Sequence, residues 1–461
     1  MSKLRDNVVF RFLNNNGMLL VLFALCGYYS VVTYSEQFPT GRDAAERLAD
    51  RIAAQFGDDA KVLVVTRANA ADVEFADVVA NRLKQSGVDV IETVNGEPVD
   101  ARKVLVRLNK KQTPVAAIAC TKMTASWLIF DDLPTDFPEL GEAQILQPES
   151  YYWPTFLKGD NLLNVANQIA VTAIIAIGMT MVIVTAGIDL SVGSLVALSA
   201  VIATLVIRDW FGGTEAGAGG LIAGCLIALV ISTLIGLFTG VMVTGFSIPP
   251  FIVTLAMMLV ARGIAYILAE GQSVYEVPDE FTWLGRHQWE LGEIALPVAV
   301  LLMLILYSMA HIVMSYTSLG RYIYAVGGNP ETARLSGVPV PLILLFAYTA
   351  SGFFSGLGGI VTASTLKSGS PTYGFMYELY VIAAVVVGGT SLSGGEGKIS
   401  GTLIGAFIIA VIRNGMNLTN VESYTQNVVL GLIILAAAML DMIKRKGMTL
   451  PAFTFIKKLL R

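Results

Sequence analysis

Long apolar runs separated by short polar stretches dominate the chain after Asn161. They predict membrane-spanning helices, because about 20 apolar residues cross a hydrocarbon core of about 30 Å, and shorter or glycine-rich runs are tolerated against neighbouring helices. The runs cover 162–186, 191–207, 219–243, 251–269, 294–315, 341–363, 377–390, 400–415 and 425–443. An earlier run, Gly17 to Thr33, predicts one more span, with a cleaved signal peptide as the alternative. We therefore expect an α-helical polytopic membrane protein with about ten transmembrane helices.

The segment 36–150 breaks this pattern and is rich in charged residues. Its short apolar strands alternate with helical stretches, which predicts a small parallel α/β sheet. The expected strands are 61–66, 88–93 and 115–119, and the expected helices are 71–86 and 98–111. The prolines that follow predict a stiff spacer rather than folded structure. They are Pro134, Pro138, Pro148 and Pro154.

The composition narrows the possible classes of protein. Hydrophobic residues make up 54% of the 461 and charged residues only 14%, which is too apolar for an ordinary soluble protein. Proteins that bind nucleic acid carry a positively charged surface, whereas this chain has a formal net charge of −4, so no nucleic-acid partner is expected. The three cysteines and two histidines are too scattered for a disulfide framework or a metal site. We expect no metal, no cofactor and no catalytic residues.

Basic residues in the short loops indicate the orientation, because Lys and Arg are enriched on the cytoplasmic side. With the N-terminus inside, the loops that carry Arg321, Arg334 and Lys398 also fall inside, while the mostly acidic loop 270–293 falls outside. Both termini are then cytoplasmic. The expected regions are a cytoplasmic N-terminus with the first helix (1–35), an extracytoplasmic domain (36–150), a transmembrane domain (151–443) and a cytoplasmic tail (444–461).

The stretch from Gly187 to Ser194 places polar groups between two apolar runs at the predicted inner face. Such groups are costly in lipid unless they line a cavity or a contact surface. Asp189 is positioned to cap the following helix and to meet its positive end. We predict an inner-face motif, with a plain capped turn as the alternative. Its candidate residues are Gly187, Asp189, Ser191 and Gly193.

The longest polar loop predicted on the inner side runs from Gly320 to Gly337. Asn329 can cap a short helix, Pro330 suits its first turn and Gly337 can end it. A motor subunit could bind a short cytoplasmic helix that lies between two spans. A solvated connecting loop is the alternative.

A third polar stretch, Gly388 to Gly401, invites comparison with a phosphate-binding loop. Leu392 stands where a Walker A motif needs glycine, and Ile399 stands where Ser or Thr must follow the lysine. We therefore expect this chain not to bind ATP itself.

Arg262 is the intramembrane polar candidate, because an ionisable group inside a span is functional by default. Its alternative is a contact with backbone or a position close to an interface. Glu378 and Arg413 are predicted near outer ends of spans, where their side chains can reach water at little cost.

These motifs, in this order, resemble the permease subunits of ribose-type ABC sugar importers. The similar stretches are Gly178 to Ser194, Gly320 to Gly337 and Ala383 to Ala406, within a continuous match over 154–443. The resemblance implies a plasma-membrane permease that forms the translocation pathway for a small, ribose-like sugar and has no enzymatic activity. It also implies a permease homodimer, cytoplasmic ATP-binding-cassette ATPases and an extracytoplasmic sugar-binding protein. By the same resemblance, the helix that couples to the ATPase comprises Gly328, Asn329, Glu331, Ala333, Arg334, Leu335, Ser336 and Gly337.

The domain at 36–150 departs from the family. Its strand and helix order resembles part of one lobe of a periplasmic sugar-binding protein, and it is too short for a complete two-lobed receptor. A docking platform, a vestigial sensor lobe and a structural insertion are its open roles. For the whole chain, a membrane-anchored sugar sensor and an ion-coupled secondary transporter are the alternatives, although the tail after Asp441 is too short for an output domain.

Overall fold

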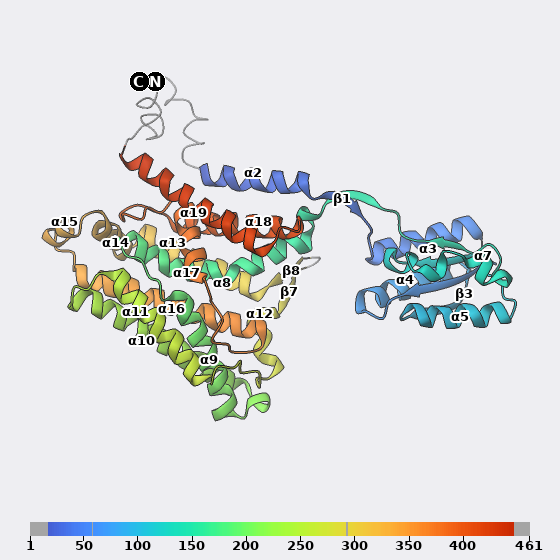
Figure 1. The fold of residues 1–461 in the computed structure, drawn as a ribbon, viewed down its shortest axis with the longest axis horizontal. Coiled ribbons are helices and arrows are strands. Elements are labelled where there is room, and N and C mark those ends of the chain that lie inside the picture. Colours follow the sequence, from blue (N-terminus) through green and yellow to red (C-terminus); the bar gives the residue numbers. More distant parts are fainter. Residues whose placement is uncertain (1–16, 58, 292–293, 447–461) are drawn as a thin grey trace, which may run out of the picture. The chain divides into compact units, whose positions relative to one another are not determined.

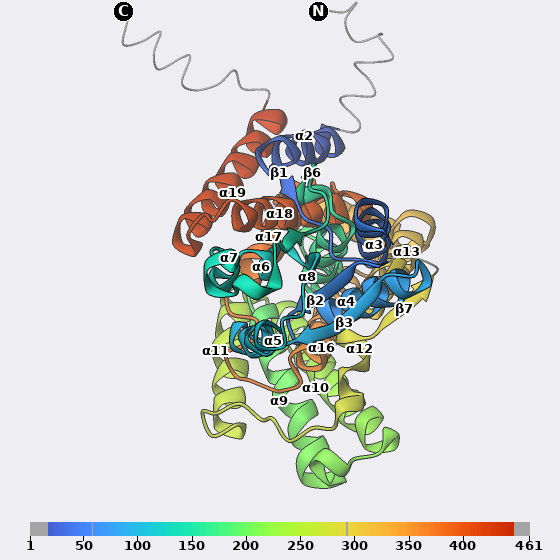
Figure 2. The same cartoon turned by 90° about the vertical axis from the view of Figure 1, so that its right-hand side faces the viewer.

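The computed structural model describes residues 17–57, 59–291 and 294–446. The chain divides into two compact units (Figures 1 and 2). The smaller unit is Tyr34–Thr155, and the larger one takes the described residues on either side of it. The start of the expected cytoplasmic N-terminus, 1–16, and most of the expected tail, 447–461, lie outside the described residues.

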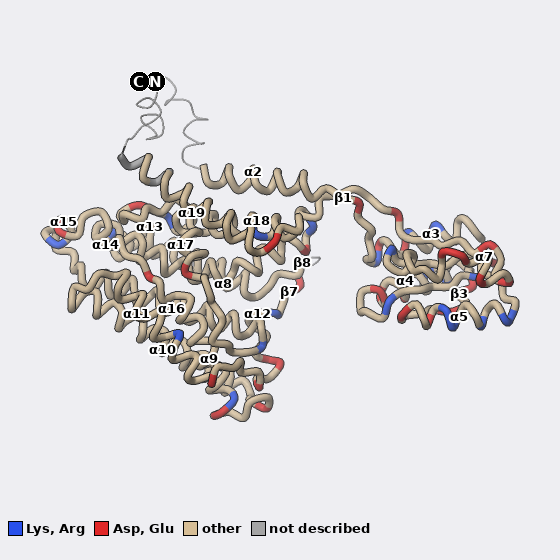
Figure 3. The backbone as a smooth tube through the Cα atoms, in the orientation of Figure 1, with Lys and Arg blue, Asp and Glu red and all other residues tan. Residues whose placement is uncertain are grey.

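The larger unit is an α-helical bundle with the composition of a polytopic membrane protein. Among the described residues, seven helices are long and apolar enough to cross a membrane. They are α8 (Gly159–Val184), α9 (Val192–Phe211), α10 (Ala218–Gly245), α11 (Pro250–Leu268), α13 (Val298–Tyr316), α16 (Val340–Leu366) and α18 (Ile399–Leu418). Charged residues are sparse along these helices and frequent in the smaller unit (Figure 3).

Shorter elements complete the bundle. Three further apolar helices are α2 (Gly17–Val32), α17 (Tyr377–Val387) and α19 (Ser423–Lys446). The connections contain α12 (Trp283–Arg286), α14 (Ser318–Gly328), α15 (Pro330–Leu335), the 3-10 turns η4 (Thr155–Leu157), η5 (Gly213–Glu215) and η6 (Asp279–Thr282), and the antiparallel strands β7 (Gln288–Leu291) and β8 (Ile294–Pro297).

The predicted span at 377–390 is wrong as a complete crossing helix. Its helix, α17, has 11 residues. At a rise of 1.5 Å per residue it is about 16 Å long, roughly half of a hydrocarbon core. The preceding residues, 367–376, form turns instead of a helix.

Small residues let α10 and α16 pack closely. A methyl group added at Gly236 would lie 2.5 Å from the Tyr348 carbonyl oxygen, and one added at Gly352 would lie 2.5 Å from the Ser232 carbonyl oxygen. In lipid, where apolar burial between helices gains little, such close backbone approach drives association. The buried small residues recur every fourth position of α10, at Gly220, Gly224, Ala228, Ser232, Gly236 and Gly240.

The smaller unit contains a four-stranded parallel sheet in the order β3-β2-β4-β5. Helices α3 and α4 pack on one face, and α5 packs on the other. The elements are β1 (Tyr34–Gln37), α3 (Arg42–Phe56), β2 (Lys61–Thr66), α4 (Ala70–Gln85), β3 (Asp89–Asn95), α5 (Pro98–Lys110), β4 (Ala117–Cys120), α6 (Lys122–Ala125), η2 (Leu128–Phe130), α7 (Leu133–Asp136), η3 (Pro138–Leu140), β5 (Gln144–Leu146) and β6 (Tyr151–Pro154).

The predicted strand and helix alternation is confirmed, but the predicted proline spacer is wrong. Pro134 and Pro138 lie in the first turns of α7 and η3, where a proline needs no amide hydrogen. Phe137 and Leu140 between and after them are buried against α5. Pro154 ends β6, which pairs antiparallel with β1 and closes the base of the unit.

Candidate functional site

Three segments that are far apart in the sequence meet where α8 ends. The amide of Gly395 donates a hydrogen bond to the carbonyl of Val184 over 2.9 Å. At Gly327, near the end of α14, an added Cβ would lie 1.7 Å from the same carbonyl oxygen. Gly394 and Gly395 have φ angles of +80° and +76°, which L side chains rarely adopt. We call Val184, Gly327, Gly394 and Gly395 the glycine junction.

Side chains reinforce this junction on two sides. The Tyr324 hydroxyl, on α14, donates to the carbonyl of Gly397 over 2.8 Å. Ala186, two residues after the end of α8, lies against Gly394, where an added Cβ would be 2.8 Å from the Ala186 methyl group. The end of α8, the end of α14 and the loop before α18 therefore form one packed body.

The predicted short helix is confirmed as α15, which lies beside α14 at one end of the bundle (Figure 1). The Asn329 side chain accepts a hydrogen bond from the Thr332 amide over 2.9 Å, and Gly337 has φ +83°. Glu331 and Arg334 form an ion pair of 2.6 Å and are 65% and 67% exposed. Hydrogen bonding to Glu331 raises the pKa of Arg334.

The loop predicted around this helix is shorter than expected. Most of Gly320–Gly337 is helical, because α14 begins at Ser318 and the Thr317 side chain accepts from the Gly320 amide over 3.3 Å. Within α15, Ala333 is buried and Leu335 is 78% exposed. The helix thus presents a charged and apolar outer face directly after the glycine junction.

The inner-face motif connects α8 to α9, and Asp189 plays a different part from the predicted one. Ser191, not Asp189, is the N-cap of α9. The buried Asp189 carboxylate accepts hydrogen bonds from the Ser191 amide over 2.9 Å and from the Ser191 and Ser351 hydroxyls over 2.6 Å each. It therefore fastens the α8–α9 connection to α16.

Gly187 and Gly193 pack against different parts of the bundle. An added Cβ at Gly187 would lie 2.3 Å from the Tyr348 hydroxyl oxygen of α16. One at Gly193 would lie 2.3 Å from the Gly374 carbonyl oxygen and 2.4 Å from a Glu378 carboxylate oxygen. The motif is thus a close-packed link between α16 and the start of α17.

Arg262 lies apart from the glycine junction. Its Nη1 donates to the carbonyls of Pro371 and Tyr373, 2.6 Å away in each case. Both carbonyls belong to the non-helical segment 367–376. The predicted alternative, a contact with backbone, is therefore present.

The structure joins the predicted coupling residues to the inner-face motif through the glycine junction. It also shows contacts of the motif that were not predicted from the sequence. Glu378 was expected near an outer end of a span, and the structure places its carboxylate beside Gly193 in the first turn of α9. Tyr348 and Ser351 were missed as partners of the motif, although their spacing of three puts them on one face of a helix. The sequence signal that pointed to Glu378 was a carboxylate at the start of the apolar run 377–390.

The arrangement is suited to transmitting movement. Across the described ranges, no group of three or more His, Cys, Asp or Glu residues could hold a metal ion. The junction consists of backbone atoms and small residues in direct contact, and packed contacts of this kind shift together because they cannot deform continuously. A displacement of α15 would therefore reach the ends of α8 and α18.

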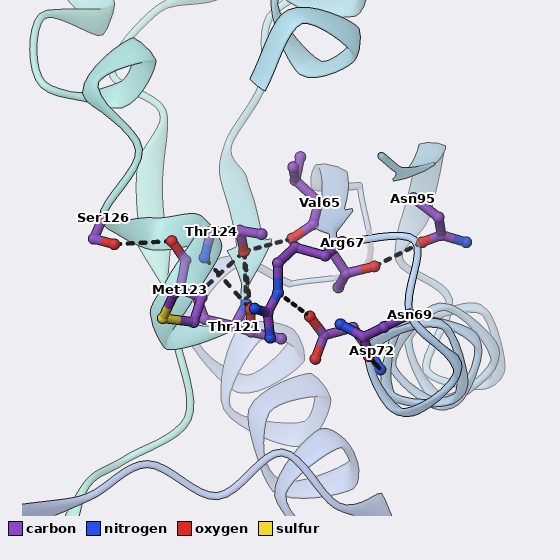
Figure 4. A network of polar contacts seen from close by, with 10 residues as sticks. Val65, Arg67, Asn69, Asp72, Asn95, Thr121, Met123, Thr124 and Ser126 are labelled. Carbon is purple, nitrogen blue, oxygen red and sulfur yellow. Dashed lines mark hydrogen bonds and ion pairs between the residues drawn. The ribbon is translucent and has the colours of Figure 1, made fainter. Parts of the chain in front are cut away.

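A second polar cluster lies in the smaller unit at the carboxyl ends of β2, β3 and β4 (Figure 4). Thr66 donates to the Asn95 side chain over 2.6 Å, and Arg67 binds Asp72 at 2.7 Å. Thr124 donates to a backbone carbonyl of β2 over 2.8 Å. Ligands often bind at this edge of a parallel sheet, but here the side chains bind one another and hold α4 and α6 to the sheet.

Comparison with known proteins places the bundle among permeases. Residues 161–438 match the family described as branched-chain amino acid transport system / permease component. The ribose import permease protein RbsC of Escherichia coli (strain K12) is 43% identical over 293 residues, which cover 62% of this chain and 87% of that protein. RbsC of Bacillus subtilis (strain 168) is 40% identical over 291 residues, with 62% and 86% covered.

A sugar permease of different specificity is also similar. The galactose/methyl galactoside import permease protein MglC of Escherichia coli (strain K12) is 36% identical over 298 residues, which cover 63% of this chain and 89% of that protein. No solved structure matches the chain. The family match begins after the smaller unit ends at Thr155.

Proposed function

The chain belongs to this family of permease components, as its sequence motifs predicted, and we propose that it forms the translocation pathway of an ATP-driven importer for a small, ribose-like monosaccharide. The glycine junction is the observation that carries the proposal. It joins an exposed, capped helix, α15, to the ends of two candidate membrane spans. The relatives named for ribose import supply the substrate class.

The importer would comprise two copies of this chain, cytoplasmic ATP-binding-cassette ATPases and an extracytoplasmic sugar-binding protein. The ATPase would hold α15 through Glu331, Arg334 and Leu335, its exposed residues. Charged side chains that lie open to water on a helix fit a protein partner better than lipid. Movement of the ATPase would then pass through the glycine junction into α8 and α18.

The membrane topology would have both termini in the cytoplasm and Tyr34–Thr155 outside. Ten segments cross in this arrangement, one of them made by α17 together with the non-helical segment before it. In the non-helical segment, Gly369 packs against Thr204 and Gly374 packs against Gly193. Thr204 and Gly193 are eleven residues apart on α9, so the segment runs along this helix for about 16 Å. With about 16 Å from α17, the two parts match the core thickness of about 30 Å.

The smaller unit would act as a docking platform for the sugar-binding protein and would bind no sugar alone. Its place in the chain, between α2 and α8, puts it on the outer side of the membrane in this topology. The pairing of the side chains at its sheet edge supports a structural role for them.

Reconstituted transport tests the proposal. The chain would be placed in proteoliposomes with its ATPase and binding protein, and uptake of radiolabelled ribose would be measured with and without ATP. We expect uptake that requires ATP and survives ionophores that collapse ion gradients. Uptake driven by an ion gradient without the ATPase would instead establish the secondary transporter, and ribose binding without any uptake would establish the sensor.

A further inference from the structure

The non-helical segment Lys367–Met376 runs beside α9 within the length of a candidate membrane span. At its start, a Cβ added at Gly369 would lie 2.1 Å from the Thr204 hydroxyl oxygen. At its end, one added at Gly374 would lie 2.3 Å from the Gly193 carbonyl oxygen. Irregular backbone therefore extends about 16 Å along a helix that is itself long and apolar enough to cross a membrane.

This segment is partly open to the surroundings. Thr372 is exposed and Phe375 is 72% exposed. Irregular backbone at membrane depth does not face lipid, because its polar groups would lack partners there; it is either covered by protein or lines a water-filled space. The face that carries Thr372 and Phe375 is therefore not a lipid-facing surface.

Two opposite charges border the same face. Arg262 uses only Nη1 for its two backbone hydrogen bonds, which leaves the other N–H groups of the guanidinium without a partner among the described residues. Glu378, in the first turn of α17, interacts electrostatically with Arg262 without a direct ion pair between the two described side chains. A guanidinium and a carboxylate can bind the hydroxyl groups of a sugar, and an exposed aromatic ring such as that of Phe375 can pack on its apolar face.

The opposite kind of surface lies on α10. Its exposed residues are all apolar and belong to an unbroken helix, as expected where a span faces lipid. They include Ile222, Leu226, Val230, Leu234 and Phe238.

We propose that Arg262, Thr372, Phe375 and Glu378 line the aqueous translocation pathway, and that the two charged side chains bind the hydroxyls of the passing sugar. We call these four residues the pathway surface. The inference rests on the proposed function, and it adds which face of the bundle the sugar meets. A second copy of the chain would supply the opposite wall.

Thiol labelling tests the location of the pathway. In a background without Cys26 and Cys225, F375C would be compared with V230C, whose native side chain is 53% exposed on α10. Cys120 can stay, because burial raises its pKa to about 12 and keeps the thiol protonated. The full reconstituted complex would be treated with a water-soluble, membrane-impermeant thiol reagent, without nucleotide and with ATP, and labelling after denaturation would give the total thiol.

We expect F375C to react at least about tenfold faster than V230C in one of the two nucleotide states, since the reagent needs ionised thiol in water. Equally slow reaction of both cysteines in both states would overturn the inference. This result does not depend on which sugar is carried. A failure of the proposed function would appear separately, as absence of ATP-dependent ribose uptake by the unmodified chain.

Charge removal tests the contact with the sugar. E378Q would slow ribose uptake about tenfold, the effect of losing one charged hydrogen bond to the moving substrate. ATP hydrolysis stimulated by the binding protein should stay within about twofold of the unmodified level, because the glycine junction is untouched. E422Q, in the exposed loop after α18, is the matched control and should transport normally. Normal uptake by E378Q would overturn the assignment of Glu378 as a sugar contact.

Discussion

Replacing Gly327 by alanine tests the glycine junction most directly. The added methyl carbon would lie 1.7 Å from the Val184 carbonyl oxygen and 2.6 Å from the Gly395 amide nitrogen. To restore an ordinary contact, the carbonyl must withdraw by roughly 1.5 Å. The hydrogen bond between Gly395 and Val184 runs through the same space and would break.

The expected cost follows from opposing contributions. Overpacking costs about 1 to 3 kcal/mol, and the lost buried hydrogen bond costs about 1 to 3 kcal/mol. Alanine in a helix regains about 0.5 to 1 kcal/mol relative to glycine. The net destabilisation is therefore about 1 to 5 kcal/mol, concentrated where α8, α14 and the loop before α18 meet.

The neighbouring Gly328 supplies a matched control. Gly328 belongs to the same helix, but a Cβ added there meets no atom within 4 Å apart from its chain neighbours and the backbone of its own helix. G328A should therefore be neutral or more stable by up to about 1 kcal/mol. G327A should lower the midpoint of thermal denaturation in detergent and reduce ATP-dependent ribose uptake in proteoliposomes. If the two variants behave alike in both measurements, close packing at the junction is not what transmits the movement.

Other features of the structure give further expectations. Alanine at both Glu331 and Arg334 should leave the protein in the membrane but uncouple ATP hydrolysis from uptake, and normal uptake with normal ATPase assembly would remove α15 from the coupling path. S351A should lower the thermal midpoint, because it deletes a hydrogen bond to the buried Asp189 side chain, and leaving a buried polar group without a partner costs about 1 to 3 kcal/mol. S355A is its control, since that buried hydroxyl has no partner among the described residues and its loss should cost little. Replacing 40–148 by a short linker keeps β1 paired with β6. This deletion should leave the bundle inserted in the membrane but change its affinity for the sugar-loaded binding protein. Unchanged docking and uptake would make the smaller unit a tolerated insertion.

Features that depend on local chemistry could be predicted from the sequence. The backbone groups at a helix terminus have no partner within the helix and need a nearby side chain or a residue with positive φ. Asn329 therefore caps the start of α15, and Gly337 follows its end. The alternation of strands and helices in the smaller unit was also correct, because hydrophobic period and chain punctuation act over a few residues. The long apolar runs and the order of the three polar motifs likewise indicated a permease before any contact was known.

Contacts between distant segments required the tertiary structure. Gly327 and Gly328 are equivalent in the sequence, and only the approach of Val184 and Gly395 distinguishes them. Asp189 was read as a local cap, but its third hydrogen bond reaches Ser351, 162 residues later.

The position of Glu378 shows the same limit of local reasoning. The apolar run that follows this residue resembles the start of a full span, so the carboxylate was expected near an outer end. In the folded chain, the segment before α17 runs back along α9 and delivers Glu378 to Gly193. Local hydropathy determined that this chain enters the membrane many times, whereas the depth and the neighbours of each polar group depend on close packing between segments that no local pattern links.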